Sequence, residues 1–271
     1  MRLRFLSPIP ELAGHVTRVW VFESDGSLPD FDMRLFVPNG SMKLIVPFRN
    51  GLLGALGGRR HLSKEHRITL AGACDEAAVI DVEDDRPSGS IGIELNPRSA
   101  YRFFRFAQED MFNRIHLLRD VIGPHARDIE QRIAAARVAQ KVTLLQRFLA
   151  RRLSAAFHPA FDYCVGRIGA TDGAVTVREL EEETGYSARW LNVTFRDKLG
   201  MSPKRFASIV RFDHCYTMLM SGRRDEFVRG ELHRLYYDQS HFARDFTHFT
   251  GFSPTRFVRE PNAFGRLFCP R

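Results

Sequence analysis

Residues 14–95 alternate apolar and polar positions over short runs. Examples are HVTRVWVFE, SMKLIVPF, AAVIDVE and GSIGIEL, separated by segments rich in Gly, Pro, Asn and Asp such as SDGSLPD and PNGS. Runs of this length with this punctuation predict the strands of an antiparallel sandwich or small barrel. No helix-length segment lies between them, which argues against a doubly wound α/β fold.

After Pro97 the apolar period lengthens to that of a helix. Between Pro124 and about Leu153, apolar residues recur at spacings of three, four or six, at Ile129, Ile133, Ala136, Val142, Leu145 and Leu149. This spacing predicts one long helix with an apolar stripe, and Pro124 suits its first turn. The stripe either packs only on its own domain or also forms the seam of a homodimer.

Strand signals are absent from residue 161 onward. The segment SAAFHPAFD (154–162) has small residues and a helix-stopping proline, and it predicts a linker. Helices are predicted at 161–169, 176–184, 187–198, 203–220, 227–234, 239–249 and 254–260. The expected fold class is therefore α+β, with an antiparallel β sandwich or barrel and flanking helices in residues 1–155 and an all-α domain in residues 161–271.

The all-α region contains one motif twice. YSARWLNVTFRDKLGMSPKRF (186–206) and DQSHFARDFTHFTGFSPTRF (238–257) match at a constant offset of 51 residues. Both contain a phenylalanine and, beginning five residues after it, Gly-x-Ser-Pro-x-Arg-Phe. Before the first copy, Thr176 and Glu179 have capping-box spacing, Gly185 ends the helix and Ser187 caps the next one. Two short helices joined by such a turn are the helix-turn-helix outline, so two copies predict two units.

The second helix of each unit has a buried stripe and a free face. Leu191 and Phe195 form the first stripe, and Phe242 and Phe246 form the second. The residues that point away are Arg189, Trp190, Asn192, Val193 and Arg196 in the first unit, and Gln239, Ser240, His241, Arg244 and Asp245 in the second. Such a helix fits the DNA major groove, where Arg reads guanine, Asn reads adenine and apolar groups contact the thymine methyl. Two units supported by the helix 203–220 can enter successive grooves about 34 Å apart and read an asymmetric site.

The amino-acid composition says less about function than the repeated motif does. The formal net charge is +8, but residues 161–271 hold 17 basic and 14 acidic residues against 23 and 18 in residues 1–160, so charge does not locate a nucleic-acid site. No apolar stretch approaches the ~18 residues of a bilayer span, and no secretory signal is visible. The four cysteines show no Cys-x-x-Cys pairing. These features predict a cytoplasmic protein without a membrane partner, and the two helix-turn-helix units predict that it is nucleoid-associated.

Residues 161–262 resemble the DNA-binding domain of the AraC/XylS family of bacterial transcription regulators. DQSHFARDFTHFTGFSPTRF is very close to that family's C-terminal signature. FVPNGSMKLIV and IGIELNPRSAYRFF resemble, more faintly, the cupin-like sensory domain of some members. The resemblance implies a transcription regulator that binds promoter DNA through two helix-turn-helix units. It also implies an N-terminal domain that binds a small-molecule effector or mediates dimerisation, and a possible contact with RNA polymerase.

The resemblance also implies which residues meet DNA. Base-facing positions fall on Arg189, Asn192 and Val193 in the first unit and on Gln239, Ser240, His241 and Arg244 in the second. Phosphate-facing positions fall on Ser187, Arg196, Lys204, Arg205 and Arg256. Such contacts set register and supply salt-dependent affinity.

Three positions depart from the family pattern. Glu181 and Glu231 stand where alanine is usual, and Leu235 stands where the second turn usually has glycine. Leu235 either holds a strained left-handed backbone or belongs to a rebuilt turn, and we expect the rebuilt turn. In that case base readout rests mainly on the first unit, and Arg244 acts chiefly on phosphate.

The N-terminal half offers little chemistry for catalysis. His61 and His66 in HLSKEH lack metal-ligand spacing, and neither a nucleophile motif nor a phosphate-binding loop is present, so we expect no catalytic residues, no metal and no cofactor. Trp20, Phe22, Phe36 and Phe48 either line an effector pocket or form ordinary sheet core. Two other functions stay open: a DNA-reading domain joined to a catalytic or repair domain, for which Cys74 is the candidate nucleophile, and a non-DNA interaction module on a degenerate helix-turn-helix pair.

Overall fold

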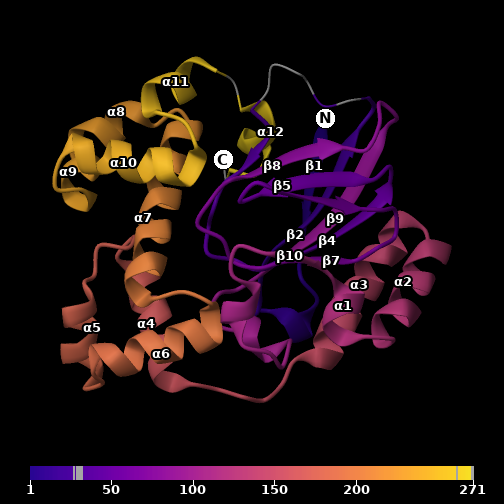
Figure 1. Cartoon of the computed structure of the whole chain (residues 1–271), viewed down its shortest axis with the longest axis horizontal. Helices are drawn as coiled ribbons and strands as arrows, with labels where there is room; N and C mark the ends of the chain where they lie inside the picture. Colours follow the sequence, from indigo (N-terminus) through magenta and orange to yellow (C-terminus); the bar gives the residue numbers. More distant parts are fainter. Residues whose placement is uncertain (27, 29–32, 261, 270–271) are drawn as a thin grey trace.

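The N-terminal half of the computed structural model is an antiparallel β sandwich (Figure 1). The structure describes residues 1–26, 28, 33–260 and 262–269. The strands are β1 (Arg2–Leu6), β2 (Val16–Ser24), β3 (Leu35–Phe36), β4 (Lys43–Arg49), β5 (Leu52–Leu56), β6 (Arg59–Ser63), β7 (Thr69–Ala71), β8 (Ala78–Val82), β9 (Ser88–Leu95) and β10 (Ile115–Leu117). One sheet has the order β1-β2-β9-β4-β7-β10 and the other β3-β8-β5-β6. The predicted antiparallel sheet is confirmed.

The larger sheet has two apolar faces. Along β2, Val19 and Val21 point into a core shared with helices, whereas Trp20 and Phe22 point toward the smaller sheet. All four side chains are at most 4% exposed. Because successive residues of a strand face opposite sides, a strand covered on both faces has a continuous apolar run, as VWVF does.

Three helices cover the outer face of the larger sheet: α1 (Leu118–Ile122), α2 (His125–Ala135) and α3 (Val138–Arg152). The prediction of one helix from Pro124 to Leu153 is wrong, because Ala136 and Arg137 are extended, with ψ of 160° and 157°. Arg137 N–H donates to the side chain of Gln140 and starts α3. The break lets both halves of the stripe reach the sheet core, where Ile133 and Leu145 are fully buried. One straight helix of about 30 residues would be roughly 45 Å long and would run past the sheet.

The C-terminal half is helical, as predicted. The helices are α4 (Pro159–Ala170), α5 (Val177–Thr184), α6 (Ala188–Leu199), α7 (Pro203–Met220), α8 (Arg224–Glu226), a π-helical turn (Phe227–Glu231), α9 (Leu232–Leu235), α10 (Gln239–Thr250), α11 (Pro254–Arg259) and α12 (Ala263–Leu267). The predicted helix at 227–234 is part of the segment from α8 to α9, and α12 has no counterpart among the predicted helices. Figure 1 shows α7 running between two helix groups, with α6 at one end and α10 at the other.

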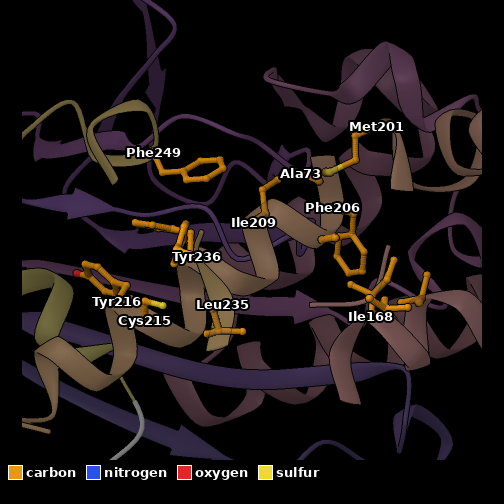
Figure 2. Close-up of a cluster of buried hydrophobic side chains, with 14 of the residues drawn as sticks. Ala73, Ile168, Met201, Phe206, Ile209, Cys215, Tyr216, Leu235, Tyr236 and Phe249 are labelled. Carbon is orange, nitrogen blue, oxygen red and sulfur yellow. The ribbon is translucent and has the colours of Figure 1, made fainter. Parts of the chain in front are cut away.

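The core of the helical half is built around α7. Phe206, Ile209 and Tyr216 point from α7 into one buried cluster with residues from the other helices, including Ile168 of α4 and Phe249 of α10 (Figure 2). The same cluster contains Ala73 and Leu35 from the β sandwich. The two halves of the chain therefore share an apolar interface in this structure.

Candidate DNA interface and effector cavity

The first helix-turn-helix unit is α5, a turn and α6. Thr176 and Glu179 form the predicted capping box, with reciprocal hydrogen bonds at the start of α5. Gly185 ends α5 in the left-handed region, with φ of 73°, a conformation that costs residues with a Cβ about 1 kcal/mol or more. Ser187 then caps α6 by accepting a hydrogen bond from Trp190 N–H.

The side chain of Glu181, which stands where the family usually has alanine, makes a contact that alanine could not make. Its carboxylate accepts a hydrogen bond from Ala188 N–H, across the turn from α5 to the start of α6. A carboxylate at this position satisfies an amide that has no partner within the helix, and it also interacts favourably with the helix dipole. Glu181 therefore ties the two helices of the first unit together.

The free face of α6 carries the predicted base-facing residues. Arg189 and Arg196 are exposed, and neither forms an ion pair within the part of the chain that the structure describes. Val193 is 63% exposed, unusual for a branched apolar side chain on a helix packed into a domain. Asn192 donates its side-chain amide to Ala188 O, so its hydrogen-bonding edge is turned back on its own helix. This surface has free guanidinium groups and an apolar centre.

The turn of the second unit is rebuilt. Leu235 ends α9 with its side chain 5% exposed, and Tyr236 continues in extended backbone with φ of −127°. Leu235 is not among the residues with positive φ. Asp238 then caps α10 by accepting a hydrogen bond from His241 N–H. Leu235 is thus a core residue, and glycine is not needed in this turn.

The predicted DNA-binding residues of the second unit differ in exposure and in whether they form ion pairs. Gln239, Ser240 and Arg244 are exposed on α10, and Arg244 forms no ion pair with any described residue. His241 lies 3.8 Å from a carboxylate oxygen of Asp245. Arg256 donates two hydrogen bonds to Glu260, at 2.7 and 3.2 Å, so its charge is balanced locally.

A polar cluster connects the two units across α7. His214 of α7 lies 3.1 Å from Asp172, which follows α4, and 3.3 Å from Glu231, which precedes α9. Arg234 forms ion pairs with both carboxylates. The two acids and the imidazole lie close enough to hold a metal ion. The guanidinium of Arg234 already compensates both carboxylates, so the arrangement is better suited to clamping the two units.

Arg205, a predicted phosphate contact, is held by the β sandwich. Its Nε lies 2.9 Å from Oδ2 of Asp75, whose side chain is only 8% exposed. The other oxygen of Asp75 accepts a 2.6 Å hydrogen bond from Asn113. Lys204, the neighbouring predicted contact, is exposed and makes no ion pair among the described residues. Sequence reasoning placed Arg205 at a phosphate without identifying its intramolecular partner.

The predicted effector residues surround a cavity between the two sheets, with one exception. Trp20, Phe22 and Phe36 line it. Phe48 lies on the opposite face of β4 and packs against the helix-covered core, which corrects the prediction for this residue. The alternation of β4 is set by its pairing with β9, where Leu44 and Val46 face the helices and Ile45 faces the cavity.

Two residues that sequence reasoning missed fill this cavity. Phe264 and Phe268, from α12 and the residue after it, lie among its lining residues and are 4% and 7% exposed. The remaining free space is about 20 Å³, room for about one water molecule. A five-residue helix has too few turns to show an apolar period, so the sequence held no signal for it beyond its two phenylalanines.

Cys74 does not have the surroundings of a reactive cysteine. Removal from water raises the pKa of its thiol above the ordinary value, and the nearby Asp75 and Glu76 act in the same direction. A catalytic thiol needs a lowered pKa. The geometry therefore gives no support to the catalytic alternative.

The fold and its two capped helix-turn-helix units define the class of the protein: a DNA-binding protein with an N-terminal β sandwich. A helix-turn-helix domain profile matches residues 180–260, and the profile of a domain of unknown function, DUF6597, matches residues 4–116. The first of these matches agrees with the resemblance of residues 161–262 to the DNA-binding domain of AraC/XylS regulators.

Solved structures share this fold at low sequence identity. ToxT from Vibrio cholerae is 9% identical, with a TM-score of 0.52 over 88% of this chain and 98% of that chain. Unsaturated fatty acid-bound ToxT from Vibrio cholerae strain SCE256 is 10% identical, with a TM-score of 0.50 over 92% of this chain and 98% of that chain. No curated protein sequence matches the chain. Among the described residues, no helix has the length and hydropathy of a membrane span.

Proposed function

We propose that the chain reads an asymmetric promoter site with α6 in one major groove and α10 in the next. The observation that carries this proposal is the exposed face of α6, where Arg189 and Arg196 have no acidic partner within the described residues. An unpaired guanidinium can take a guanine edge or a phosphate without first breaking an ion pair. The clamp of Asp172, His214, Glu231 and Arg234 favours a fixed spacing of the two units.

The two units contribute unequally to this readout. In the first unit, Arg189 and Val193 point away from a buried stripe of Leu191 and Phe195. In the second unit, Arg256 is neutralised by Glu260 and the entry turn is rebuilt. We therefore assign base selection mainly to α6, and phosphate binding to Lys204, to Arg244 and to Arg205 once it has left Asp75.

The β sandwich is proposed to hold a small apolar effector. Its cavity is lined by aromatic and aliphatic side chains from both sheets. The related fold of ToxT has been solved with an unsaturated fatty acid bound. The division into a sensory region, residues 1–155, and a DNA-binding region, residues 161–271, follows from this proposal. Homodimerisation and contact with RNA polymerase stay predictions from the family resemblance.

The test begins with capture of genomic DNA by the purified protein. Operators found in this way are then titrated by fluorescence anisotropy with wild type, Arg189→Ala and Arg178→Ala. Arg178 is the matched control, because it lies on α5 of the same unit and is paired with Glu182. We expect Arg189→Ala to relax preference at one position of the site and Arg178→Ala to leave the preference unchanged. Equal site preferences for all three proteins would contradict the assignment of α6.

A further inference from the structure

The segment 262–269 leaves the helical half of the chain and docks on the β sandwich. In Figure 1, α12 lies beside the strands and away from α10 and α11. The ring of Phe268 lies 5.2 Å from that of Trp20 and 4.9 Å from that of Phe36, measured between centroids. The ring of Phe264 lies 5.5 Å from that of Phe22. Two aromatic side chains of this segment thus occupy the cavity proposed for the effector.

Polar contacts hold the segment at both of its ends. Arg18 donates a 2.6 Å hydrogen bond to Phe268 O. At the other end, Asn262 accepts hydrogen bonds from Leu35 N–H and Gly265 N–H. Its amide also donates to the hydroxyl of Tyr216 in α7, at 3.0 Å. Asn262 therefore joins the sandwich, the segment and the helix that supports both DNA-binding units.

Most of the cavity wall lies outside the segment. It comes from the two sheets and includes Trp20, Ile45, Leu52, Ile80 and Val82. Two buried polar atoms of lining residues, Trp20 Nε1 and Ser88 Oγ, have no hydrogen-bond partner among the described residues. Unsatisfied buried donors are uncommon and costly, so a ligand or water with an acceptor would be favoured there.

We propose that Phe264 and Phe268 are an intramolecular ligand of this cavity, and that an apolar aromatic molecule carrying a carbonyl or similar acceptor competes with them for it. The acceptor would replace Phe268 O at Arg18 or meet the free Trp20 Nε1–H. This inference deepens the proposed effector function and rests on it for the identity of the site. Entry of a ligand releases segment 262–269, which breaks the hydrogen bonds that join Asn262 to Leu35 of the sandwich and to Tyr216 of α7.

Competition of this kind has a quantitative signature. The apparent dissociation constant of an external ligand equals its intrinsic value divided by the fraction of molecules in which the segment is released. Any change that weakens docking of the segment without altering the cavity wall therefore strengthens ligand binding. Asn262 is 1% exposed and does not line the cavity, so Asn262→Ala meets this condition.

The experiment uses prodan, a fluorescent naphthyl ketone, titrated into the full chain. Wild type is compared with Asn262→Ala, with the double variant Phe264→Ala/Phe268→Ala and with Phe157→Ala, a control phenylalanine that is 65% exposed. Thermal melts identify any variant that fails to fold. Hydrogen exchange of the peptide spanning 262–269 is followed with and without prodan.

We expect prodan to bind about tenfold more tightly to Asn262→Ala and to the double variant than to wild type, and equally to wild type and Phe157→Ala. Prodan should also speed hydrogen exchange in 262–269 of wild type. Equal affinity in all four proteins, no binding to any of them, or binding with unchanged exchange in 262–269 would each overturn the proposal. Operator binding is measured separately, so loss of the DNA-binding function would be distinguished from failure of the competition.

Discussion

Replacing Asp75 by asparagine should strengthen DNA binding. Asp75 lies in the β sandwich half, and its carboxylate holds Arg205 at 2.9 Å, so Arg205 must leave this ion pair before it can contact a phosphate. Asn113 donates to the other oxygen of Asp75, and an asparagine at position 75 can still accept that hydrogen bond. The substitution thus removes the charge and preserves the local fold.

The magnitude follows from how exposed the pair is. Arg205 is 42% exposed whereas Asp75 is 8% exposed, so the pair lies between a surface ion pair and a buried one. Exposed pairs are worth about 0.2–1 kcal/mol, and we take about 1 kcal/mol for this one. Since 1.4 kcal/mol corresponds to a factor of ten, Asp75→Asn should lower the operator Kd by roughly fivefold.

The assay is an anisotropy titration of labelled operator at several salt concentrations. Asp84→Asn is the matched control, because it removes the same charge from an exposed aspartate that is paired with Arg86 in the same half of the chain. Arg205→Ala should weaken binding and reduce the salt slope by about one. In the Arg205→Ala background, Asp75→Asn should have no further effect, since the two changes act on one interaction. The reasoning is refuted if Asp84→Asn strengthens binding equally, or if the gain persists without Arg205.

Four other changes test the interface and its support. Arg189→Ala should weaken operator binding by ~1–3 kcal/mol, and an unchanged binding-site logo would contradict this. Leu235→Gly should lower the free energy of unfolding by at least ~2–5 kcal/mol in a denaturant titration, because it empties a buried site; a higher Tm would instead indicate a strained turn. Glu181→Ala should lower the free energy of unfolding by about 1 kcal/mol, because it removes the hydrogen bond from Ala188 N–H. Equal free energies of unfolding for wild type and the variant in chemical denaturation would contradict this. Asp213 lies on α7, and removal from water raises the pKa of its carboxyl from 3.8 to about 6. Between about pH 4 and pH 6 the native state therefore binds a proton that the unfolded state does not, and the free energy of unfolding falls as pH rises. Asp213→Asn should remove this pH dependence, so its Tm should exceed that of wild type at pH 7.5 and equal it below about pH 4. Parallel curves of Tm against pH for the two proteins would contradict this prediction.

Local signals in the sequence determined most of the helical half. Caps such as Thr176 and Ser187, and the apolar stripes of α6 and α10, depend on hydrogen bonds and side-chain spacings that lie within a few residues of one another. The repeat of Gly-x-Ser-Pro-x-Arg-Phe then indicated two units. In the N-terminal half, the alternation of apolar positions was enough to predict the strands of an antiparallel sheet.

Tertiary structure decided the features that depend on contacts between residues far apart in the sequence. The face of Phe48 was set by the pairing of β4 with β9, and the break before Arg137 by the need of α2 and α3 to cover one sheet. Arg205 meets Asp75 across 130 residues, and Phe268 reaches Arg18 across 250. No window of sequence contains both members of such a pair, and an aspartate or a phenylalanine has the same local pattern whether its partner is water or another domain. The sequence therefore determined the two helix-turn-helix units, whereas their attachment to the β sandwich was decided by long-range packing and charge pairing.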